Sequence, residues 1–231
     1  MLFDIPWDLS SEWAFALSII PILLIGMKVT VLATIFGFLI AMIMGLVFAL
    51  LRAAPTRFIS WPTAFLIEFI RDTPLLIQLF VIYYVLPSTV GITLPALEAG
   101  SVALGLQYSA YTSEVYRAGL QAVPRGQWEA ARALNISTWR VYSDIVIPQA
   151  IPRIIPALGN YLVSIIKDTP ILSAITVMEV LNVATIIGDR TYRYMVPITM
   201  VGVLFLILTL ISAALVKFLE SRLPRAGIAV K

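Results

Sequence analysis

The 231-residue sequence contains no cysteine and no histidine, and only 13% of its residues are charged. The lack of cysteine excludes a disulfide framework, and the lack of both residue types excludes the usual zinc sites and His-dependent catalytic triads. Soluble domains carry about 25% charged residues. Here 60% of the residues are hydrophobic, which excludes a water-soluble fold and a disordered chain alike. The composition predicts an integral membrane protein with few groups for chemistry.

Five apolar stretches are long enough to cross a hydrocarbon core of about 30 Å as helices. They cover approximately residues 29–51, 65–86, 95–113, 154–180 and 196–219. A shorter apolar stretch, residues 13–27, contains Pro21, and we expect it to form an interfacial helix leading into the first span, with Lys28 at the membrane edge. The acidic N-terminus argues against the alternative of a cleaved signal peptide.

Lysine and arginine are unevenly distributed between the loops. Eleven of the sixteen lie in the turn after the first span, in the loop from Arg117 to Arg153 and in the C-terminal tail, whereas the other side holds Arg190 and Arg193. Positive charge is concentrated on the cytoplasmic side of membrane proteins. We therefore expect an all-α fold of five transmembrane helices, with the N-terminus outside and the C-terminus in the cytoplasm.

Small residues recur every fourth position in the first and third spans. They are Ala33, Gly37, Ala41, Gly45 and Ala49 in the first, and Ser101, Gly105, Ser109 and Ser113 in the third. This spacing places them on one helix face, where they let another backbone approach closely. The pattern predicts tight helix packing and indicates nothing about a ligand.

An internal repeat places charge inside two of the predicted spans. The sequence Ile-Arg-Asp-Thr-Pro at residues 70–74 recurs as Ile-Lys-Asp-Thr-Pro at residues 166–170. Asp-Thr-Pro predicts a helix break and restart, with a side-chain N-cap followed by proline. Such breaks at membrane depth need protein or water to satisfy the freed backbone groups. The candidates for lining or gating a path through the membrane are Arg71, Asp72, Thr73, Lys167, Asp168, Thr169 and, directly after the third span, Glu114.

Two interpretations of the repeated charges remain open. In the first, Arg71 pairs with Asp168 and Lys167 with Asp72, which would form a buried lock between spans. In the second, the charges and the positive helix N-termini line a path for a zwitterionic solute.

The longest interior loop contains a short helical segment. Pro124 is suited to open it, and Asn135 is suited to close it in the left-handed conformation. Glu129 is spaced to pair with Arg125 and Arg132, at a few tenths of a kcal/mol for each pair. A small apolar face is expected from Ala130, Ala131 and Leu134. The pattern alone fits a solvated surface helix as well as a helix that enters a partner's groove.

This loop closely resembles the EAA signature of ATP-binding-cassette (ABC) importer permeases. Glu129-Ala130-Ala131 is followed by Asn135 and then by Ile-Val-Ile-Pro ending at Pro148. The family usually has Gly in place of Asn135 and Leu in place of Ile147. Asparagine is the next best left-handed cap, and isoleucine conserves the volume of leucine, so both departures are mild.

Two further segments resemble the polar amino-acid branch of that family, the histidine, glutamate, glutamine, arginine and opine permeases. They are residues 110–124 and residues 71–79. That branch often has glycine where Asp72 stands, so this chain carries an additional acid inside the membrane.

The resemblance extends from about Gly26 to Leu219 and implies a type I ABC importer transmembrane domain in the inner membrane. It implies two cytoplasmic ATPase subunits that bind ATP and Mg, a second permease subunit that is identical or paralogous, and an extracytoplasmic solute-binding protein, with surrounding lipid and no nucleic acid. The loop of residues 120–148 would then carry the coupling helix. The residues expected to contact the ATPase are Trp128, Glu129, Ala130, Ala131, Leu134 and Asn135, with Pro148 ending the segment.

The sequence has no phosphate-binding Gly-x4-Gly-Lys-Ser/Thr motif, so this chain is expected to hold no cofactor and to be no enzyme. The expected solute is an amino acid or a similar zwitterion. A compatible solute such as ectoine, hydroxyectoine or a betaine is the first alternative. An ion-gradient-driven secondary carrier is the second, although it leaves the Glu-Ala-Ala loop without a purpose. A membrane enzyme is a distant third, because no nucleophile and base are visible together.

Overall fold

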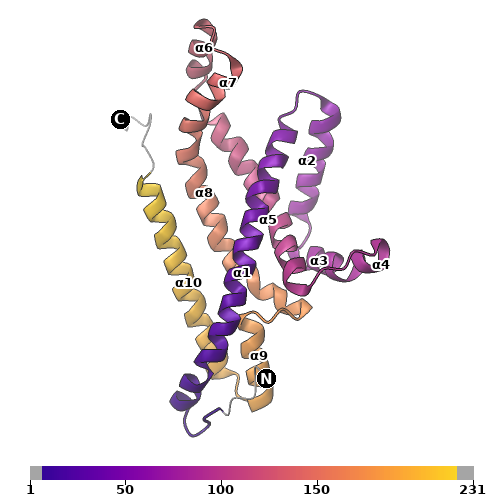
Figure 1. Cartoon of the computed structure of the whole chain (residues 1–231), viewed down its shortest axis with the longest axis vertical. Helices are drawn as coiled ribbons and strands as arrows, with labels where there is room; N and C mark the ends of the chain where they lie inside the picture. The colour runs from indigo at the N-terminus through magenta and orange to yellow at the C-terminus, as the bar shows by residue number, and fades with distance from the viewer. Residues whose placement is uncertain (1–6, 223–231) are drawn as a thin grey trace.

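The computed structural model describes residues 7–222, and all regular secondary structure in that range is helical (Figure 1). The main helices are α1 (Glu12–Arg52), α2 (Arg57–Asp72), α3 (Leu75–Phe80), α4 (Leu86–Val90), α5 (Ala96–Gln121), α6 (Arg125–Ala133), α7 (Thr138–Arg140), α8 (Ile147–Asp168), α9 (Val180–Thr191) and α10 (Met195–Arg222). Two π-helical segments, η1 (Val81–Val85) and η2 (Val141–Val146), and a 3-10 helix, η3 (Thr169–Ile175), join some of them.

The first helix is one continuous rod, which corrects the expectation of a separate interfacial helix over residues 13–27. α1 has 41 residues and includes Pro21 in its interior. Phe15, Ile19 and Leu23 are fully buried in a cluster with residues of α9. Because this tertiary contact covers the apolar face of the first turns, the helix continues through the proline into the first span.

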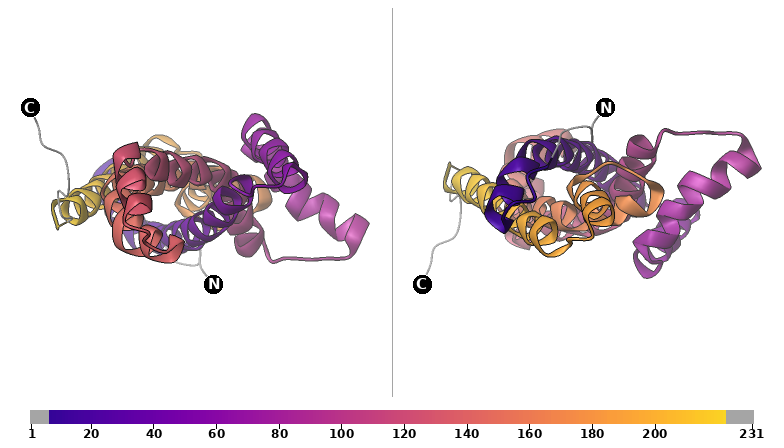
Figure 2. Two further views of the ribbon diagram at one scale, coloured as in Figure 1. Left: turned by 90° about the horizontal axis from the view of Figure 1, so that it is seen from above. Right: turned by 90° about the horizontal axis from the view of Figure 1, so that it is seen from below.

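The long helices run roughly along one axis, and the short helices α3 and α4 diverge from it. α6 and α7 lie at one end of the molecule, whereas the beginning of α1 and the α9–α10 turn lie at the other (Figure 1). Figure 2 shows α3 and α4 projecting sideways from the bundle. Arg193 Nη1, in the turn between α9 and α10, lies 3.7 Å from Oε1 of Glu12, the first residue of α1. Arg193 is therefore at the same end as the first turn of α1, as the expected alternation of sides requires.

Five groups of helices correspond roughly to the five predicted spans: α1, α2–α4, α5, α8–α9 and α10. Within residues 7–222, α1 and α10 are each long and apolar enough to cross a membrane alone. A further span is possible if Thr138–Ile175 and Val180–Thr191 act together, with a bend of 49° between them. The second predicted span, residues 65–86, is divided between α2 and the apolar segment Leu75–Val90. The orientation in the membrane stays a prediction.

The two stripes of small residues form the contact between α1 and α5, which confirms the predicted packing face. All five small residues of the α1 stripe are buried. A Cβ atom added to Gly105 would lie 2.5 Å from Ile40 Cβ and 3.1 Å from the backbone oxygen of Gly37. The hydroxyl of Thr112 donates a 2.7 Å hydrogen bond to the carbonyl oxygen of Ala41. This backbone approach brings the polar part of α5 next to the end of α1.

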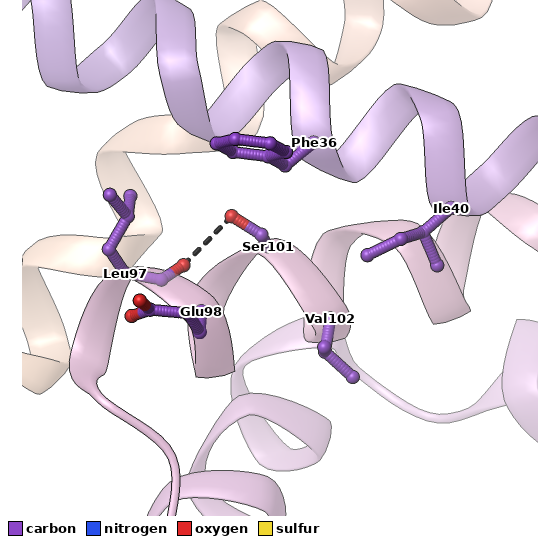
Figure 3. Close-up of a pocket in the computed structure, with 6 residues that line it drawn as sticks. All are labelled: Phe36, Ile40, Leu97, Glu98, Ser101 and Val102. Atoms are coloured by element: carbon purple, nitrogen blue, oxygen red, sulfur yellow. Dashed lines mark hydrogen bonds between the residues drawn. The ribbon is translucent and has the colours of Figure 1, made fainter.

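Further along the same contact, α1 and α5 leave a surface pocket of about 260 Å³ (Figure 3). Its lining residues are Phe36, Ile40, Leu97, Glu98, Ser101 and Val102. The hydroxyl of Ser101 donates to the carbonyl oxygen of Leu97 in its own helix, at 2.8 Å. The pocket therefore offers little polar recognition, and it is not a candidate solute site.

Replacing Gly105 with alanine tests the α1–α5 contact. We expect Gly105→Ala to destabilise the protein by about 1–3 kcal/mol, because the added methyl group overpacks a contact made with backbone and with the stiff Cβ of Ile40. Gly202→Ala in α10 is the matched control, since nothing lies within 4 Å of its added Cβ. Thermal unfolding of the purified protein measures both variants. Equal melting temperatures would contradict the assigned packing.

Candidate functional site

The first Asp-Thr-Pro segment interrupts a helix as predicted. α2 ends at Asp72, and α3 begins after Pro74. The expected side-chain N-cap is wrong, because Pro74 is the N-cap residue of α3 and makes no side-chain cap bond. The Asp72 side chain is exposed. The break therefore redirects the chain sideways without using the acid as a cap.

Two glutamines that the sequence interpretation missed satisfy this break. The two hydrogens of Gln78 Nε2 are shared among three acceptors: the carbonyl oxygen of Ile70 at 2.8 Å, the hydroxyl of Thr73 at 2.7 Å and Oε1 of Gln107 in α5 at 2.6 Å. The freed backbone acceptor of α2 is thereby paired inside the protein, as a break in an apolar medium requires. The sequence signal that could have revealed them is their position. Gln78 lies five residues after Thr73, and Gln107 lies within the third predicted span.

The second Asp-Thr-Pro segment also interrupts the α-helix, in another form. α8 ends at Asp168, and the chain continues as the 3-10 helix η3. Asp168 is not a side-chain cap; its Oδ2 accepts a 2.6 Å hydrogen bond from the hydroxyl of Tyr108 in α5. Thr169 is fully buried and its hydroxyl donates a 2.7 Å hydrogen bond to the carbonyl oxygen of Ile166, whereas Lys167 and Asp168 are both exposed.

The hypothesis of a cross-paired lock is wrong for this conformation. Arg71 Nη1 lies 3.4 Å from Glu68 Oε1 on its own helix, and its guanidinium lies 5.7 Å from the ring centroid of Tyr111. Among the described residues, no ion pair joins Arg71 to Asp168 or Lys167 to Asp72. Because one break turns the chain sideways and the other continues α8, equivalent charges in the two copies do not face each other.

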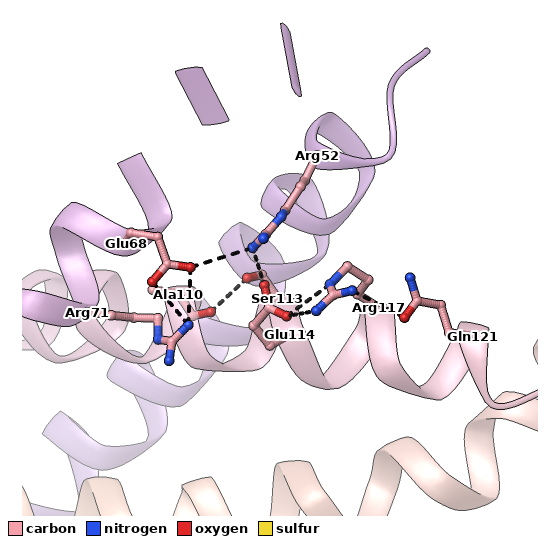
Figure 4. A network of polar contacts seen from close by, with 8 residues as sticks. All are labelled: Arg52, Glu68, Arg71, Ala110, Ser113, Glu114, Arg117 and Gln121. Atoms are coloured by element: carbon pink, nitrogen blue, oxygen red, sulfur yellow. Dashed lines mark hydrogen bonds and ion pairs between the residues drawn. The ribbon is translucent and has the colours of Figure 1, made fainter. Parts of the chain in front are cut away.

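Glu114 lies in a network of charges that joins three helices (Figure 4). Its carboxylate accepts hydrogen bonds from Arg52 at the end of α1 and from Arg117, one turn further along α5. Arg52 Nη1 also lies 4.0 Å from Glu68 Oε1 of α2, which in turn pairs with Arg71. The sequence placed Arg52 and Arg117 among the loop charges, but a one-dimensional count cannot show that they converge on one carboxylate.

Tyrosines and a pocket follow the contact between α5 and α8. The rings of Tyr108, Tyr111 and Tyr161 lie with centroids 5.7–5.9 Å apart. Beside them is a pocket of about 360 Å³. It is lined by Tyr111, Glu114, Val115, Ala118, Gly119, Arg153, Ala157 and Tyr161. We call the polar residues along this contact, which run from Asp168 through the three tyrosines and Glu114 to Arg153, the α5–α8 polar strip. The sequence interpretation missed the tyrosines and Arg153.

The predicted loop helix is present at the far end of the molecule (Figure 1). Pro124 is the N-cap residue of α6, and Asn135 has a φ of 53°, so both terminal predictions are confirmed. Asparagine tolerates this left-handed conformation better than most residues. Pro148 lies in the first turn of α8, after the π-helical segment η2.

The apolar face expected on this helix is only partly correct. Ala131 is buried with Val123 and Val146 of the same chain, so it does not face outward. Trp128 is half-buried, and its ring lies 5.3 Å from that of Tyr142.

The outward surface of α6 is small and mixed in character. It includes Glu129, Ala130 and Leu134, the last of which is 73% exposed. Asn135 is exposed next to them. The predicted pairs of Glu129 with Arg125 and Arg132 are absent from the ion pairs of the described residues, which leaves the carboxylate available to a partner.

The described residues contain no group of three acidic side chains placed to hold a metal ion. What the geometry offers is a polar strip inside a helix bundle and an exposed helix at one end.

Comparison with known proteins agrees with this arrangement. Residues 41–225 match the family described as "Binding-protein-dependent transport system inner membrane component". The chain is 54% identical to a probable amino-acid ABC transporter permease protein, y4tG, of Sinorhizobium fredii, over 100% of both chains. It is 34% identical to the arginine transport system permease protein ArtQ of Bacillus subtilis, covering 88% of this chain and 93% of that one.

Solved structures show the same fold. One described as "Crystal structure of an amino acid ABC transporter with histidines" aligns with a TM-score of 0.82 at 38% identity, covering 88% of this chain and 94% of that chain. An inward-facing MetNI methionine ABC transporter aligns with a TM-score of 0.69 at 19% identity, over 87% and 93% of the two chains, and supports the fold alone.

The chain therefore belongs to the family of binding-protein-dependent transport system inner membrane components. Within it, the chain is the multi-pass, inner-membrane permease subunit of an amino-acid ABC importer. It is a transport subunit and not an enzyme, and the ATPase is a separate subunit. The compatible-solute and secondary-carrier alternatives are not favoured.

A double-mutant cycle tests the observed pairing. Arg52→Gln and Glu114→Gln should show a coupling energy of about 1–3 kcal/mol, because each removal takes the most direct partner from a partly buried charge and leaves it only its second one, Arg117 for Glu114 and Glu68 for Arg52. The matched cycle of Arg71→Gln and Asp168→Asn should be additive. Thermal unfolding of the four single and two double variants provides the measurement. Strong coupling in the second cycle would restore the cross-paired lock.

Proposed function

We propose that α6 is the coupling helix, which transmits the ATP-driven movement of a cytoplasmic ATPase dimer to this permease. Its exposed Glu129, Ala130 and Leu134 provide a small docking surface at one end of the molecule. The rest of α6 is fixed to the bundle through Ala131 and Trp128. A helix held on one face and exposed on the other can transmit a push without detaching.

The proposed docking of α6 on the ATPase also implies the orientation of the chain in the membrane. The end that carries α6 faces the cytoplasm, and the end with Glu12 and Arg193 faces outward, as the distribution of lysine and arginine predicts. ATP and Mg would bind on the partner ATPase, because this chain has no phosphate-binding loop.

We further propose that the α5–α8 polar strip lines the solute path. Polar and charged groups are expensive at membrane depth unless they face a cavity or one another. Here Asp168, Tyr108 and Tyr161 continue into the pocket that holds Glu114. Thr73 and Arg71 join this region through Gln78 and Tyr111 respectively. Asp72 and Lys167, which are exposed, would flank the path at the two breaks.

A single chain provides only one wall for such a path. The pocket of the strip is open along its side, and an amino acid crossing lipid needs its charges shielded on every side. A second permease subunit, identical or paralogous, would complete the enclosure. An extracytoplasmic solute-binding protein would deliver the solute to the outer end.

The solute class follows from the relatives and from the charges. Relatives are named for glutamine, arginine and L-cystine transport. The strip carries both acidic and basic groups, which suits the zwitterionic part common to these molecules. L-glutamine, L-arginine and L-cystine therefore form the test panel.

Site-directed cross-linking tests the docking of α6. Because the chain has no cysteine, Leu134→Cys introduces a single reactive thiol. We expect this variant to cross-link to the ATPase in the assembled transporter, whereas Ala131→Cys, which is buried, should not. Thr56→Cys in the α1–α2 turn is the exposed control. Equal cross-linking at Leu134 and Thr56 would contradict a specific contact at α6.

Conservative changes in the strip test the path. We expect Asp168→Asn and Tyr108→Phe to lower ATP-driven uptake of the transported panel amino acid about tenfold or more in proteoliposomes, since the first removes the negative charge of the acceptor and the second removes the hydroxyl donor of their hydrogen bond. Asp144→Asn, an exposed acid outside the strip, should transport normally. Leu134→Cys cross-linking in the same background confirms assembly. Normal uptake by both strip variants would refute the path.

A further inference from the structure

Most arginines of the region have an acidic partner, but Arg153 does not. Its Nη1 donates to the backbone carbonyl oxygen of Ala122, and among the described residues it makes no ion pair. A guanidinium has five N–H donors in a fixed fork. Arg153 is exposed, so four of these donors remain available, and the side chain lines the open pocket of the α5–α8 polar strip.

The one carboxylate in that pocket cannot balance Arg153. Glu114 already accepts hydrogen bonds from Arg52 and from Arg117, so two positive charges surround it before Arg153 is counted. Among the charged residues of the lining and of the ion-pair network that reaches Glu114, Arg52, Arg71, Arg117 and Arg153 stand against Glu68 and Glu114. The excess of two positive charges favours an anion in the pocket.

The remaining lining adds neutral donors and limits the size of the ligand. Tyr111 accepts a 3.4 Å hydrogen bond from Gln107 Nε2, so its own hydroxyl hydrogen is free to donate. Tyr161 stacks on Tyr111 with ring centroids 5.7 Å apart. The volume of about 360 Å³ is near the lower end of small-molecule sites, which span about 300–1,000 Å³. Ala118, Gly119 and Ala157 line part of the wall without filling the space.

We propose that this pocket is a carboxylate-binding subsite, in which Arg153 holds the α-carboxylate of the transported amino acid. The proposal rests on the polar strip being the solute's path, and it adds a residue and a chemical group to it. Arg153 lies two turns of α8 away from Tyr161, toward the end that carries α6. The subsite would therefore hold the solute near the cytoplasmic end of the path, where every α-amino acid presents the same group.

The specificity that follows is for the common part of the molecule. A fork that binds the α-carboxylate bidentately does not distinguish side chains, but it rejects an analogue in which the carboxylate is an amide. A lysine in place of Arg153 would keep the charge and lose the fork.

Thiol labelling of the assembled transporter in lipid nanodiscs tests whether the electrostatic potential in the pocket is positive. Ala118→Cys places a single cysteine in the lining, and Thr56→Cys serves as the exposed reference. We expect the ratio of modification rates by an anionic and a cationic methanethiosulfonate to be about tenfold higher at Ala118→Cys than at the reference. Adding Arg153→Gln should lower the ratio, and adding Arg153→Lys should preserve it.

Protection from labelling tests the ligand. The transported panel amino acid should slow modification at Ala118→Cys, whereas its α-carboxamide should not, and protection should disappear with both Arg153→Gln and Arg153→Lys. Equal ratios at the two cysteines, no modification at Ala118→Cys, protection by the carboxamide, or protection that survives Arg153→Gln would each overturn the proposal. The coupling of α6 and uptake through Asp168 are measured separately, so these outcomes leave the proposed function standing.

Discussion

The close approach of α1 and α5 is the constraint on which the rest of the molecule depends. Small side chains on both helices let the backbones meet, and Gly105 has no space for even a methyl group against Ile40. This contact brings Arg52, at the end of α1, to Glu114 of α5. α5 then supplies Tyr108 to Asp168 and Gln107 to Gln78, so both broken segments are attached to a helix whose position α1 fixes.

The two Asp-Thr-Pro segments show how one short sequence gives different structures in different surroundings. After Pro74 the chain leaves the bundle, and Gln78 donates to the carbonyl oxygen of Ile70 that the break has freed. After Asp168 the chain tightens into a 3-10 helix that stays within the core through the buried Leu172 and Ile175. The break itself is a local property of proline and could be predicted, whereas its direction is decided by tertiary packing.

The same division separates what the sequence could and could not predict about the site. Periodicity of small residues predicted the α1–α5 face, and cap chemistry predicted Pro124 and Asn135, because both are local patterns. The partner of Asp168 could not be predicted, because Tyr108 lies 60 residues away in the sequence and many other polar residues were equally eligible as partners. Ala131 was assigned outward because a nine-residue helix carries too little periodicity to fix its rotation.

The length of α1 has a consequence for the way this permease sits in a bilayer. At 1.5 Å per residue its 41 residues extend about 60 Å, roughly twice the hydrocarbon thickness. Tilting within the range of about 0–40° found for membrane helices shortens this span too little to bury all of it. The segment with Phe15 and Ile19 has its own packed partner in α9. Protein contacts thus cover the part of α1 that exceeds the hydrocarbon thickness, so a change in bilayer thickness would move the lipid boundary along α1 without unfolding its N-terminal end.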